Sequence, residues 1–394
     1  MSENMKEKAL HAYKDNFREP EGGKLFFAPG RVNLIGEHTD YNGGHVFPCA
    51  LTLGTYGVFR KRNDRILRFY SANEPEVGVV ETSLDQLAPG RSREWTAYPE
   101  GVVFTLLSHG YQVNTGFDMA ICGDLPGGAG LSSSASLDVL TAFAVRELFG
   151  LDIADHELAI FSKEADNSYC GINCGIMDQF TVAMGKKDHA IYLDTSDLSY
   201  ECVPLKLDGM KIVISNTNKK HSLVDSQYNQ RWSECRQALA ELQTVVDIEN
   251  LCDLSPEEFE KYKDAISEPV IRRRAKHAIY EDARCREAVR VLKAGDIRGF
   301  GRLMNEAHIS VSRDYEVTGP ELDTLQEEAL KLPGVIGSRM TGGGFGGCTV
   351  SIVEEGAVEE FRKKVGDAYL KKIGYPADFY VVEVGGGPAV LEVL

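Results

Sequence analysis

The sequence is short of basic residues and of long apolar runs. Among its 394 residues, 59 Asp and Glu outnumber 43 Lys and Arg, and the formal net charge is −16. A nucleic-acid-binding surface needs clustered Lys and Arg to neutralise phosphates, so this balance argues against a nucleic-acid partner. The one basic run, Arg272 to Arg274 followed by Lys276, is interpreted as a solvated helix face. No stretch approaches the roughly 18 apolar residues of a membrane span, so no membrane partner is expected.

Cysteine signals of a disulfide framework or a zinc site are missing too. The nine cysteines are odd in number and occur as scattered singles without a CxxC pair. A reducing cytoplasm is therefore the expected location. The closest pair, Cys170 and Cys174, is interpreted as small packing residues near a tight turn. Residues 1–17 are charged and lack the apolar core of a signal peptide, which agrees with a cytoplasmic protein.

The length predicts two domains with a site between them, because 394 residues exceed one ordinary core. Strand-like and helical segments follow one another without a regular βαβ order, so an α+β fold is favoured over a doubly wound sheet. The crossing with the fewest motifs lies near residues 205–210. We therefore predict an N-terminal domain of residues 1–207 and a C-terminal domain of residues 208–394. The first strand, which begins near residue 24, is expected to break at Pro29-Gly30.

GDLPGGAGLSSSAS, at residues 123–136, joins a predicted strand to a predicted helix. Backbone amides freed by such a turn, at the positive end of a helix, form a cradle for anions. The segment therefore indicates phosphate binding, although glycine-rich turns can also be plain connections. It is not a Walker loop, and the protein-kinase markers HRD and DFG are absent. Ser132, Ser133 and Ser134 could cap the helix, but three hydroxyls exceed what a cap requires.

Two further segments carry candidate chemistry. MTGGGFGGCTV, at residues 340–350, is either a tight hairpin or a loop whose backbone can approach a ligand. In KEADNSYCGINCGIMDQF, at residues 163–180, Asp178 emerges from a small, largely apolar turn. A partly desolvated carboxylate can act as a general base for a sugar hydroxyl. The alternative is that Asp178 caps a helix beginning at Gln179.

GEHTDYNGG, at residues 36–44, places two carboxylates and an imidazole within four positions on irregular backbone. Taken alone, Glu37, His38 and Asp40 suggest a metal or acid/base cluster. Carboxylates can also accept hydrogen bonds from adjacent hydroxyls of a pyranose, and the remaining segments favour that second interpretation.

Together these segments resemble the GHMP kinases, most closely the galactokinase branch. PGRVNLIGEHTDYNGG (29–44) is similar to the galactokinase signature, and GGAGLSSSAS (127–136) to the family's phosphate-binding motif. SRMTGGGFGGCTV (338–350) is similar to its third motif, and CGIMDQF (174–180) to the segment that carries its catalytic aspartate. NEAHISVSRDYEVTGPELD (305–323) also resembles the family. The matches keep the family's order along the chain.

The resemblance implies a two-lobed α+β GHMP kinase fold with ATP and sugar in the cleft between the lobes. It implies transfer of the γ-phosphate of ATP to the anomeric C1 hydroxyl of α-D-galactose, the first committed step of the Leloir pathway. ATP, galactose and Mg²⁺ are thus the expected small-molecule ligands, and a monomer is expected.

The resemblance also implies roles for individual residues. Asp178 stands at the position of the catalytic base and Arg31 at that of the catalytic cation. The implied sugar-binding residues are Glu37, His38, Thr39, Asp40, Gly175 and Tyr228. The alternative for His38 is that it orients the turn without touching the sugar. The implied nucleotide-binding residues are Ser71, Gly128, Ala129, Gly130, Leu131, Ser132, Ser133 and Ser134. Trp95 or Tyr98 falls where the family lines the adenine site, and core packing is the alternative for both.

Ser134 and Asp166 are the implied magnesium ligands, and Asp166 is a departure from the family. Galactokinases usually have Ala-Glu-Asn or Ala-Glu-His twelve residues before the catalytic aspartate, whereas this chain has Ala165-Asp166-Asn167. Aspartate is shorter by one carbon–carbon bond, roughly 1.5 Å. Either the ion shifts toward it or a water bridges the gap, and magnesium commonly retains several waters.

Two alternative functions are compatible with the same segments. Some galactokinase-like proteins are sugar sensors without turnover, but those lose residues of the serine-rich motif, and Ser134-Ala135-Ser136 is intact here. The second alternative function is that of a kinase for a related sugar such as N-acetylgalactosamine. In that relative the Asn-Gly-Gly at residues 42–44 is commonly replaced, so its presence favours galactose.

Overall fold

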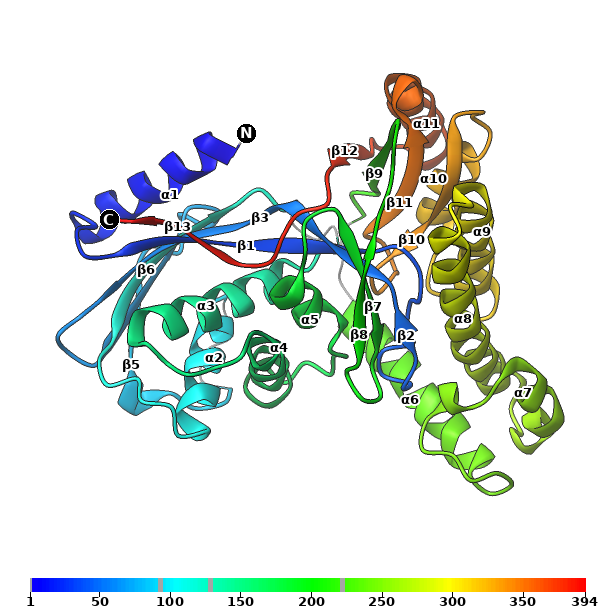
Figure 1. Ribbon diagram of the computed structural model, residues 1–394, viewed down its shortest axis with the longest axis horizontal. Helices are drawn as coiled ribbons and strands as arrows, with labels where there is room; N and C mark the ends of the chain where they lie inside the picture. Colours follow the sequence, from blue (N-terminus) through cyan, green and yellow to red (C-terminus); the bar gives the residue numbers. More distant parts are fainter. Residues whose placement is uncertain (1, 91–94, 127–129, 220–223) are drawn as a thin grey trace.

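The structure is a computed structural model that describes residues 2–90, 95–126, 130–219 and 224–394. Two large sheets lie at opposite ends of the molecule, each covered by helices (Figure 1). The helices and strands do not alternate regularly, which confirms the predicted α+β class.

The first sheet has six strands in the order β13-β1-β3-β6-β4-β5, and only β4 and β6 pair in parallel. Its strands are β1 (Lys24–Asn33), β3 (Pro48–Lys61), β4 (Ile66–Ser71), β5 (Val80–Ser83), β6 (Phe117–Gly123) and β13 (Ala389–Val393). Helix α1 (Ser2–Phe17) covers one face. The other face carries α2 (Ala97–Ser108), α3 (Ser133–Phe149), α4 (Asp155–Glu164) and α5 (Met177–Met184). Because both faces are covered, β6 is buried on both sides.

The second sheet is antiparallel, in the order β10-β11-β9-β12. Its strands are β9 (Met210–Asn216), β10 (Val335–Thr341), β11 (Cys348–Glu354) and β12 (Asp378–Val382). The helices of this half are α6 (Val224–Leu242), α7 (Pro256–Tyr262), α8 (Pro269–Lys293), α9 (Ile297–Arg313), α10 (Pro320–Ala329) and α11 (Val358–Ile373). A small third sheet of β2 (His45–Val46), β7 (His189–Asp194) and β8 (Tyr200–Pro204) lies between the two large ones.

The expected strand break at Pro29-Gly30 is wrong, because β1 continues to Asn33. The two residues instead form a bulge, where the pairing with β3 shifts register between Pro29 and Arg31. A bulge accommodates a proline that cannot donate to the ladder, and it re-aims the side chain that follows. The following residue here is Arg31.

The predicted domain boundary at residues 207/208 falls between β8 and β9. The chain's last strand, β13, returns to pair with β1, so a unit built on the first sheet also takes in residues 389–393. One apolar core contains residues of both halves, among them Val32 and Leu34 with Ile214 and Val350. The division into two domains stays a prediction.

Candidate active site

A cavity of about 380 Å³ is lined by residues of both halves of the chain. From the first half come parts of three segments quoted above, at residues 29–44, 123–136 and 163–180. From the second half come one end of α6 and the glycine-rich segment at residues 340–350, called the third glycine-rich loop below because it resembles the family's third motif. The lining residues predicted from the sequence are Arg31, Glu37, His38, Asp40, Ser134, Asp166, Gly175, Asp178 and Tyr228. Residues as far apart in the sequence as Arg31 and Gly343 thus meet around one space, which is lined by three carboxylates and one guanidinium of the predicted catalytic and sugar-binding sets.

Arg31 and Asp178 form a two-pronged ion pair at this cavity. Arg31 Nε donates to Asp178 Oδ1 at 2.7 Å, and Nη2 donates to Oδ2 at 2.6 Å. Arg31 Nη1 donates to the carbonyl of Gly130 at 2.6 Å, so its side chain joins the carboxylate to the phosphate-binding segment. Helix α5 begins at Met177, which places Asp178 within the first turn and excludes it as the cap. Charge-assisted pairs of this geometry fix the direction of both groups.

The glycine- and serine-rich segment enters α3 through left-handed backbone at Gly130 (φ 66°) and Ser132 (φ 60°). Gly128 and Ala129 lie outside the described residues. Leu131 is buried, and its carbonyl accepts from the backbone N–H of Arg31 at 3.2 Å. Ser132 Oγ donates to Asp178 Oδ2, a contact that the sequence did not predict. Ser133 starts α3 on its exposed side.

Ser134 follows in the first turn of α3 and lines the cavity. The positive end of α3 therefore faces the cavity, as an anion site requires.

Ser71, Trp95 and Tyr98 are not part of the cavity lining within the described chain. Ser71 ends β4, is buried, and its hydroxyl accepts from the N–H of Asn73 at 3.3 Å. Trp95 and Tyr98 pack against the apolar core of the first sheet. The core alternative is thus the one that this geometry favours for both aromatic residues.

Residues 36–44, called the signature turn below, are held mainly by their own side chains. Thr39 is fully buried, and its hydroxyl lies within hydrogen-bond distance of two carbonyls that share its one proton, those of Gly36 at 2.9 Å and His45 at 2.8 Å. Asn42 Nδ2 donates to the carbonyl of His38 at 2.8 Å. Thr39 does not line the cavity, so its contacts brace the turn, and the prediction that it binds sugar gains no support here.

Glu37 connects the signature turn to the third glycine-rich loop. Its Oε1 accepts from Arg339 Nη1 at 3.3 Å and from the N–H of Gly342 at 2.8 Å. Burial raises the pKa of Glu37, and the charge of Arg339 opposes that shift. Arg339 is completely buried, and its contact with Glu37 was not predicted although it lies within the third motif.

Asp40 and Gly175 lie directly against each other at the cavity. A Cβ on Gly175 would lie 1.8 Å from Asp40 Oδ2, so only glycine leaves room for this carboxylate. Burial raises the pKa of Asp40 to about 7, and the charges of Asp178 and Glu37 act in the same direction. The ring of Tyr228, on α6, lies 5.6 Å from that of His38. Tyr228 lines the cavity as part of the wall that the second half of the chain contributes.

Helix α8 supports the signature turn from behind, through residues that the sequence analysis missed. His277 Nε2 lies 3.1 Å from the carbonyl of Glu37, and Glu281 Oε1 accepts from the N–H of Gly36 at 2.9 Å. Asp282 Oδ1 accepts from the N–H of His45 at 2.6 Å. One pattern in the sequence could have revealed them. Three polar residues share one side of α8, and the second and third follow the first by four and five positions.

The interpretation of the run at 272–276 as a solvated helix face is wrong for Arg274. This residue is 2% exposed, and its guanidinium donates to Glu234 at 2.8 Å and to Glu316 at 2.6 Å. The charge is buried because two carboxylates from other elements pair with it.

The predicted magnesium ligands have side chains that suit a divalent cation. Asp166 lies in a π-helical turn (Ala165–Cys170), and its Oδ2 accepts from Gln179 Nε2 at 2.7 Å. Its Oδ1 and both carboxylate oxygens of buried Asp138 find no donor among the other described residues, and the two carboxyl groups hydrogen-bond to each other when one of them is protonated. Burial raises the pKa of Asp166 to about 6, and burial together with the neighbouring Asp166 raises that of Asp138. A cation beside two such carboxylates would offset their desolvation.

Protein ligands for that ion are few. Within residues whose placement is described, no cluster of three or more His, Cys, Asp or Glu side chains is arranged to hold a metal. Magnesium is commonly held by one or two carboxylates with waters and substrate phosphates completing the shell, so Ser134 and Asp166 remain a fitting pair.

Three family models match the chain. The galactokinase galactose-binding signature matches residues 11–61, the N-terminal domain of the GHMP kinases residues 97–186, and their C-terminal domain residues 288–371. Methanococcus jannaschii mevalonate kinase shares the fold at a TM-score of 0.66 and 19% identity. The three matches and the fold together identify the chain as a GHMP kinase.

Closer relatives are galactokinases. The chain is 55% identical to galactokinase of Clostridium acetobutylicum, over 92% of this chain and 93% of that protein. It is 50% identical to galactokinase of Ligilactobacillus salivarius, over 96% of this chain and 98% of that protein. The crystal structure of Lactococcus lactis galactokinase complexed with galactose matches at a TM-score of 0.96 and 44% identity, covering 98% and 99% of the two chains. The chain belongs to the galactokinase family.

Across the described parts of the chain, no helix combines the length and apolar character needed to cross a membrane.

Proposed function

We propose that the protein transfers the γ-phosphoryl group of ATP to the C1 hydroxyl of α-D-galactose, releasing ADP and α-D-galactose 1-phosphate. The observation that carries the proposal is the Arg31–Asp178 pair. It lines one cavity together with the signature turn and the first turn of α3, and the sugar and the phosphates are assigned to these two sides of the pair. A sugar hydroxyl and a phosphoryl group placed on these two sides meet at the pair, as an in-line transfer requires.

Asp178 accepts the hydroxyl proton as the C1 oxygen attacks the γ-phosphorus. In the sugar-free structure the Asp178 carboxylate accepts hydrogen bonds from Arg31 and Ser132. The sugar hydroxyl therefore replaces one of these two donors when it binds. Arg31, released in part, faces the charge that develops on the transferring group, and such preorganised cations stabilise that charge. Mg²⁺, held by Ser134 and Asp166, would neutralise charge on the phosphates.

Sugar binding is assigned to the acceptors and rings around the cavity. Asp40 and Glu37 accept from ring hydroxyls, Tyr228 covers the sugar, and Gly175 leaves room for Asp40. An analogue that lacks a hydroxyl leaves a buried carboxylate unpaired, which is the strong form of discrimination between sugars. The backbone of residues 130–134, together with Gly128 and Ala129, is assigned to the phosphates of ATP.

The working form is proposed to be a monomer in the reducing cytoplasm, which suits nine cysteines that all carry free thiols.

A sugar panel tests this proposal. Purified protein is supplied with MgATP and galactose, glucose, talose, galactosamine or N-acetylgalactosamine, and kcat/KM is determined from ADP release. Galactose is expected to be among the best substrates, and ³¹P and ¹H NMR of the product should show phosphate on C1 of the α-anomer. A higher kcat/KM for N-acetylgalactosamine than for galactose would reassign the substrate. Binding of both ligands without ADP release would indicate a sensor.

A further inference from the structure

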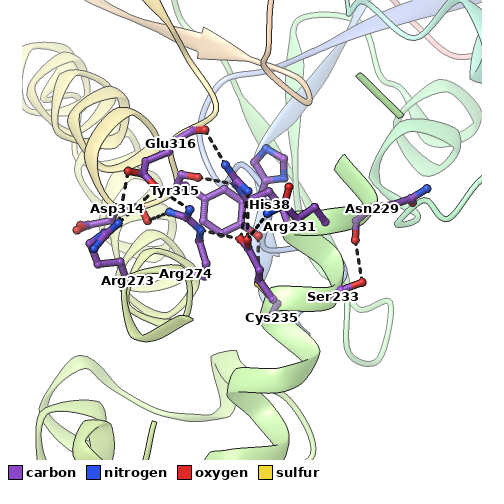
Figure 2. Close-up of polar contacts among 12 residues, drawn as sticks. His38, Asn229, Arg231, Ser233, Cys235, Arg273, Arg274, Asp314, Tyr315 and Glu316 are labelled. Carbon is purple, nitrogen blue, oxygen red and sulfur yellow. Dashed lines mark hydrogen bonds and ion pairs between the residues drawn. The ribbon is translucent and has the colours of Figure 1, made fainter. Parts of the chain in front are cut away.

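Four buried side chains form an unbroken polar relay from α6 to the signature turn, and Figure 2 labels three of them, Cys235, Tyr315 and His38. Cys235 Sγ lies 3.0 Å from the hydroxyl oxygen of Tyr315, which lies 2.7 Å from that of Tyr41. The hydroxyl of Tyr41 in turn lies 2.8 Å from His38 Nδ1. His38 Nε2, at the far end, is buried and has no hydrogen-bond partner among the described residues. We call Cys235, Tyr315, Tyr41 and His38 the relay.

The protons of the relay can point in one of two directions. If they point toward Cys235, the last acceptor is a thiol sulfur, a weak acceptor that Asn42 Nδ2 already approaches at 3.6 Å. If they point toward His38, the thiol donates to Tyr315, Tyr315 to Tyr41, and Tyr41 to the imidazole nitrogen, a strong acceptor. The second direction leaves Sγ to accept from Asn42 and satisfies every member.

We infer that the relay fixes His38 as the tautomer with its proton on Nε2, and that this N–H donates to an oxygen of the sugar. The inference rests on the proposed function, because it takes the cavity to be the sugar site, and it makes Tyr41, Tyr315 and Cys235 positioning residues.

Electrostatics keep the relay neutral. Burial, followed by the charges of His277 and Arg231, lowers the pKa of His38 well below its usual value. Burial raises the pKa values of Tyr41 and Tyr315 well above the ordinary range. The neutral ring of His38 therefore carries one N–H proton. One ring nitrogen is a donor and the other is an acceptor. The backbone carbonyl of Gly343 acts in the opposite direction and favours the protonated ring.

Two arginines hold Tyr315 in place through its own backbone carbonyl and those of its two neighbours (Figure 2). Arg231 Nε donates to the carbonyl of Tyr315 at 2.7 Å, and its Nη2 donates to that of Glu316 at 3.0 Å. Arg274 Nη1 donates to the carbonyl of Asp314 at 2.7 Å. Three consecutive carbonyls are thus anchored, and the Tyr315 ring stays 4.7 Å from that of His38. Since Arg231 and Cys235 are one turn apart on α6, the same helix supplies the anchor and the start of the relay.

A donor at His38 completes the chemistry of the cavity. The carboxylates of Glu37, Asp40 and Asp178 can only accept when ionised, whereas each sugar hydroxyl both donates and accepts. A hydroxyl that donates to a carboxylate still has lone pairs, and Nε2–H is placed to bind one of them.

The tautomer can be measured on the sugar-free protein. In protein labelled with ¹⁵N-histidine, long-range ¹H–¹⁵N correlations separate protonated from unprotonated ring nitrogens, and His38→Gln identifies the signals of His38. We expect Nε2 protonated and Nδ1 unprotonated from pH 6 to 8, and a shift of the Nε2 resonance when galactose is added. A proton on Nδ1 in the wild-type protein would overturn the inference.

Variants of the relay add a kinetic test. Loss of one hydrogen bond corresponds to about a tenfold change, so Tyr41→Phe should raise KM for galactose about tenfold and leave KM for ATP within about twofold. Cys235→Ser keeps a donor and should stay near wild type, whereas Cys235→Ala should give a mixed tautomer population. Tyr369→Phe is the matched control, because it removes a buried tyrosine hydrogen bond, to the carbonyl of Thr217, on another element.

Failure of this inference differs from failure of the proposed function. If galactose is phosphorylated but leaves the His38 resonances unchanged, His38 only steadies the turn and the inference fails alone. If galactose is not phosphorylated, the proposed function fails, while the tautomer measured without sugar still reports on the relay. Equal effects of Tyr41→Phe and Tyr369→Phe on KM for galactose would refute a role for the relay in sugar binding.

Discussion

Arg31 and Asp178 are 147 positions apart in the sequence and share two parallel hydrogen bonds of 2.7 and 2.6 Å. The guanidinium is almost fully buried, with 5% of its side chain exposed, whereas 30% of the carboxylate is exposed. The pair thus has a covered cationic side and an open side on which a hydroxyl can approach the carboxylate.

Removal of the carboxylate should stop turnover. We expect Asp178→Ala to reduce kcat by at least about 10²-fold, because a positioned base contributes ~10²–10⁴-fold. Nucleotide affinity, measured by calorimetry, should stay within about threefold. A variant that keeps most of its activity would exclude Asp178 as the base.

Arg31→Lys should also lower kcat strongly, because lysine cannot form the two parallel bonds to Asp178. Arg290→Lys is the matched control, since Arg290 pairs with Glu287 on the exposed surface of α8 and is 70% exposed. Equal kcat values for the two variants would show that the two-pronged geometry is unimportant.

Asp166 is expected to govern the response to magnesium. Asp166→Ala should raise the Mg²⁺ concentration for half-maximal activity about tenfold or more, while KM for galactose changes less than about twofold, since one charged ligand is lost. Asp166→Glu restores the family's longer side chain and should stay closer to wild type. Exposed Asp155→Ala is the control. Equal losses of Mg²⁺ and galactose affinity after Asp166→Ala would indicate a structural role only.

Gly175→Ala should weaken sugar binding through steric displacement of Asp40. The added Cβ would lie 1.8 Å from Asp40 Oδ2, so the carboxylate has to move. We expect KM for galactose to rise about tenfold, roughly one lost charged hydrogen bond. Gly356→Ala is the control, because its Cβ would meet nothing within 4 Å. An unchanged KM for galactose would mean that Asp40 does not bind sugar from its present position.

Much of the site was predictable because its residues occur in contiguous segments with strict local demands. A phosphate cradle needs glycines and hydroxyls within a few positions, and the signature turn carries its own bracing residues, such as Thr39. The supporting residues have no such pattern. Arg339 lies 302 positions from Glu37, and Glu281 lies 245 positions from Gly36, so only the fold brings them together.

Two predictions from the sequence were wrong because contacts between distant segments were not visible in it. Proline and glycine usually end a strand, but at Pro29-Gly30 the neighbouring β3 absorbs the irregularity as a bulge. Basic residues usually face solvent, but Arg274 meets Glu234 and Glu316 from other elements. In both cases tertiary contacts overrode a sound local expectation.

Asp40 should make the sugar-free protein less stable as pH rises. Burial raises its pKa from 3.8 to about 7, so between these pH values the folded state holds a proton that the unfolded state has released. The free energy of unfolding therefore falls across this window, and the full penalty is present above pH 7. Asp40→Asn carries no charge and escapes the penalty, while it should bind galactose more weakly because an acceptor is lost.

Thermal unfolding without sugar, followed at pH 4.5 and pH 8, measures this effect. Relative to wild type, Asp40→Asn should unfold at a higher temperature at pH 8, by roughly 1–2 °C for each kcal/mol of relief, with a smaller difference at pH 4.5. Asp155→Asn, on an exposed carboxylate, should show no such dependence. A lower unfolding temperature for Asp40→Asn at pH 8 would mean that the carboxylate is ionised and stabilised in the free protein. In that case sugar hydroxyls would have to displace existing partners of Asp40 instead of relieving an unpaired charge.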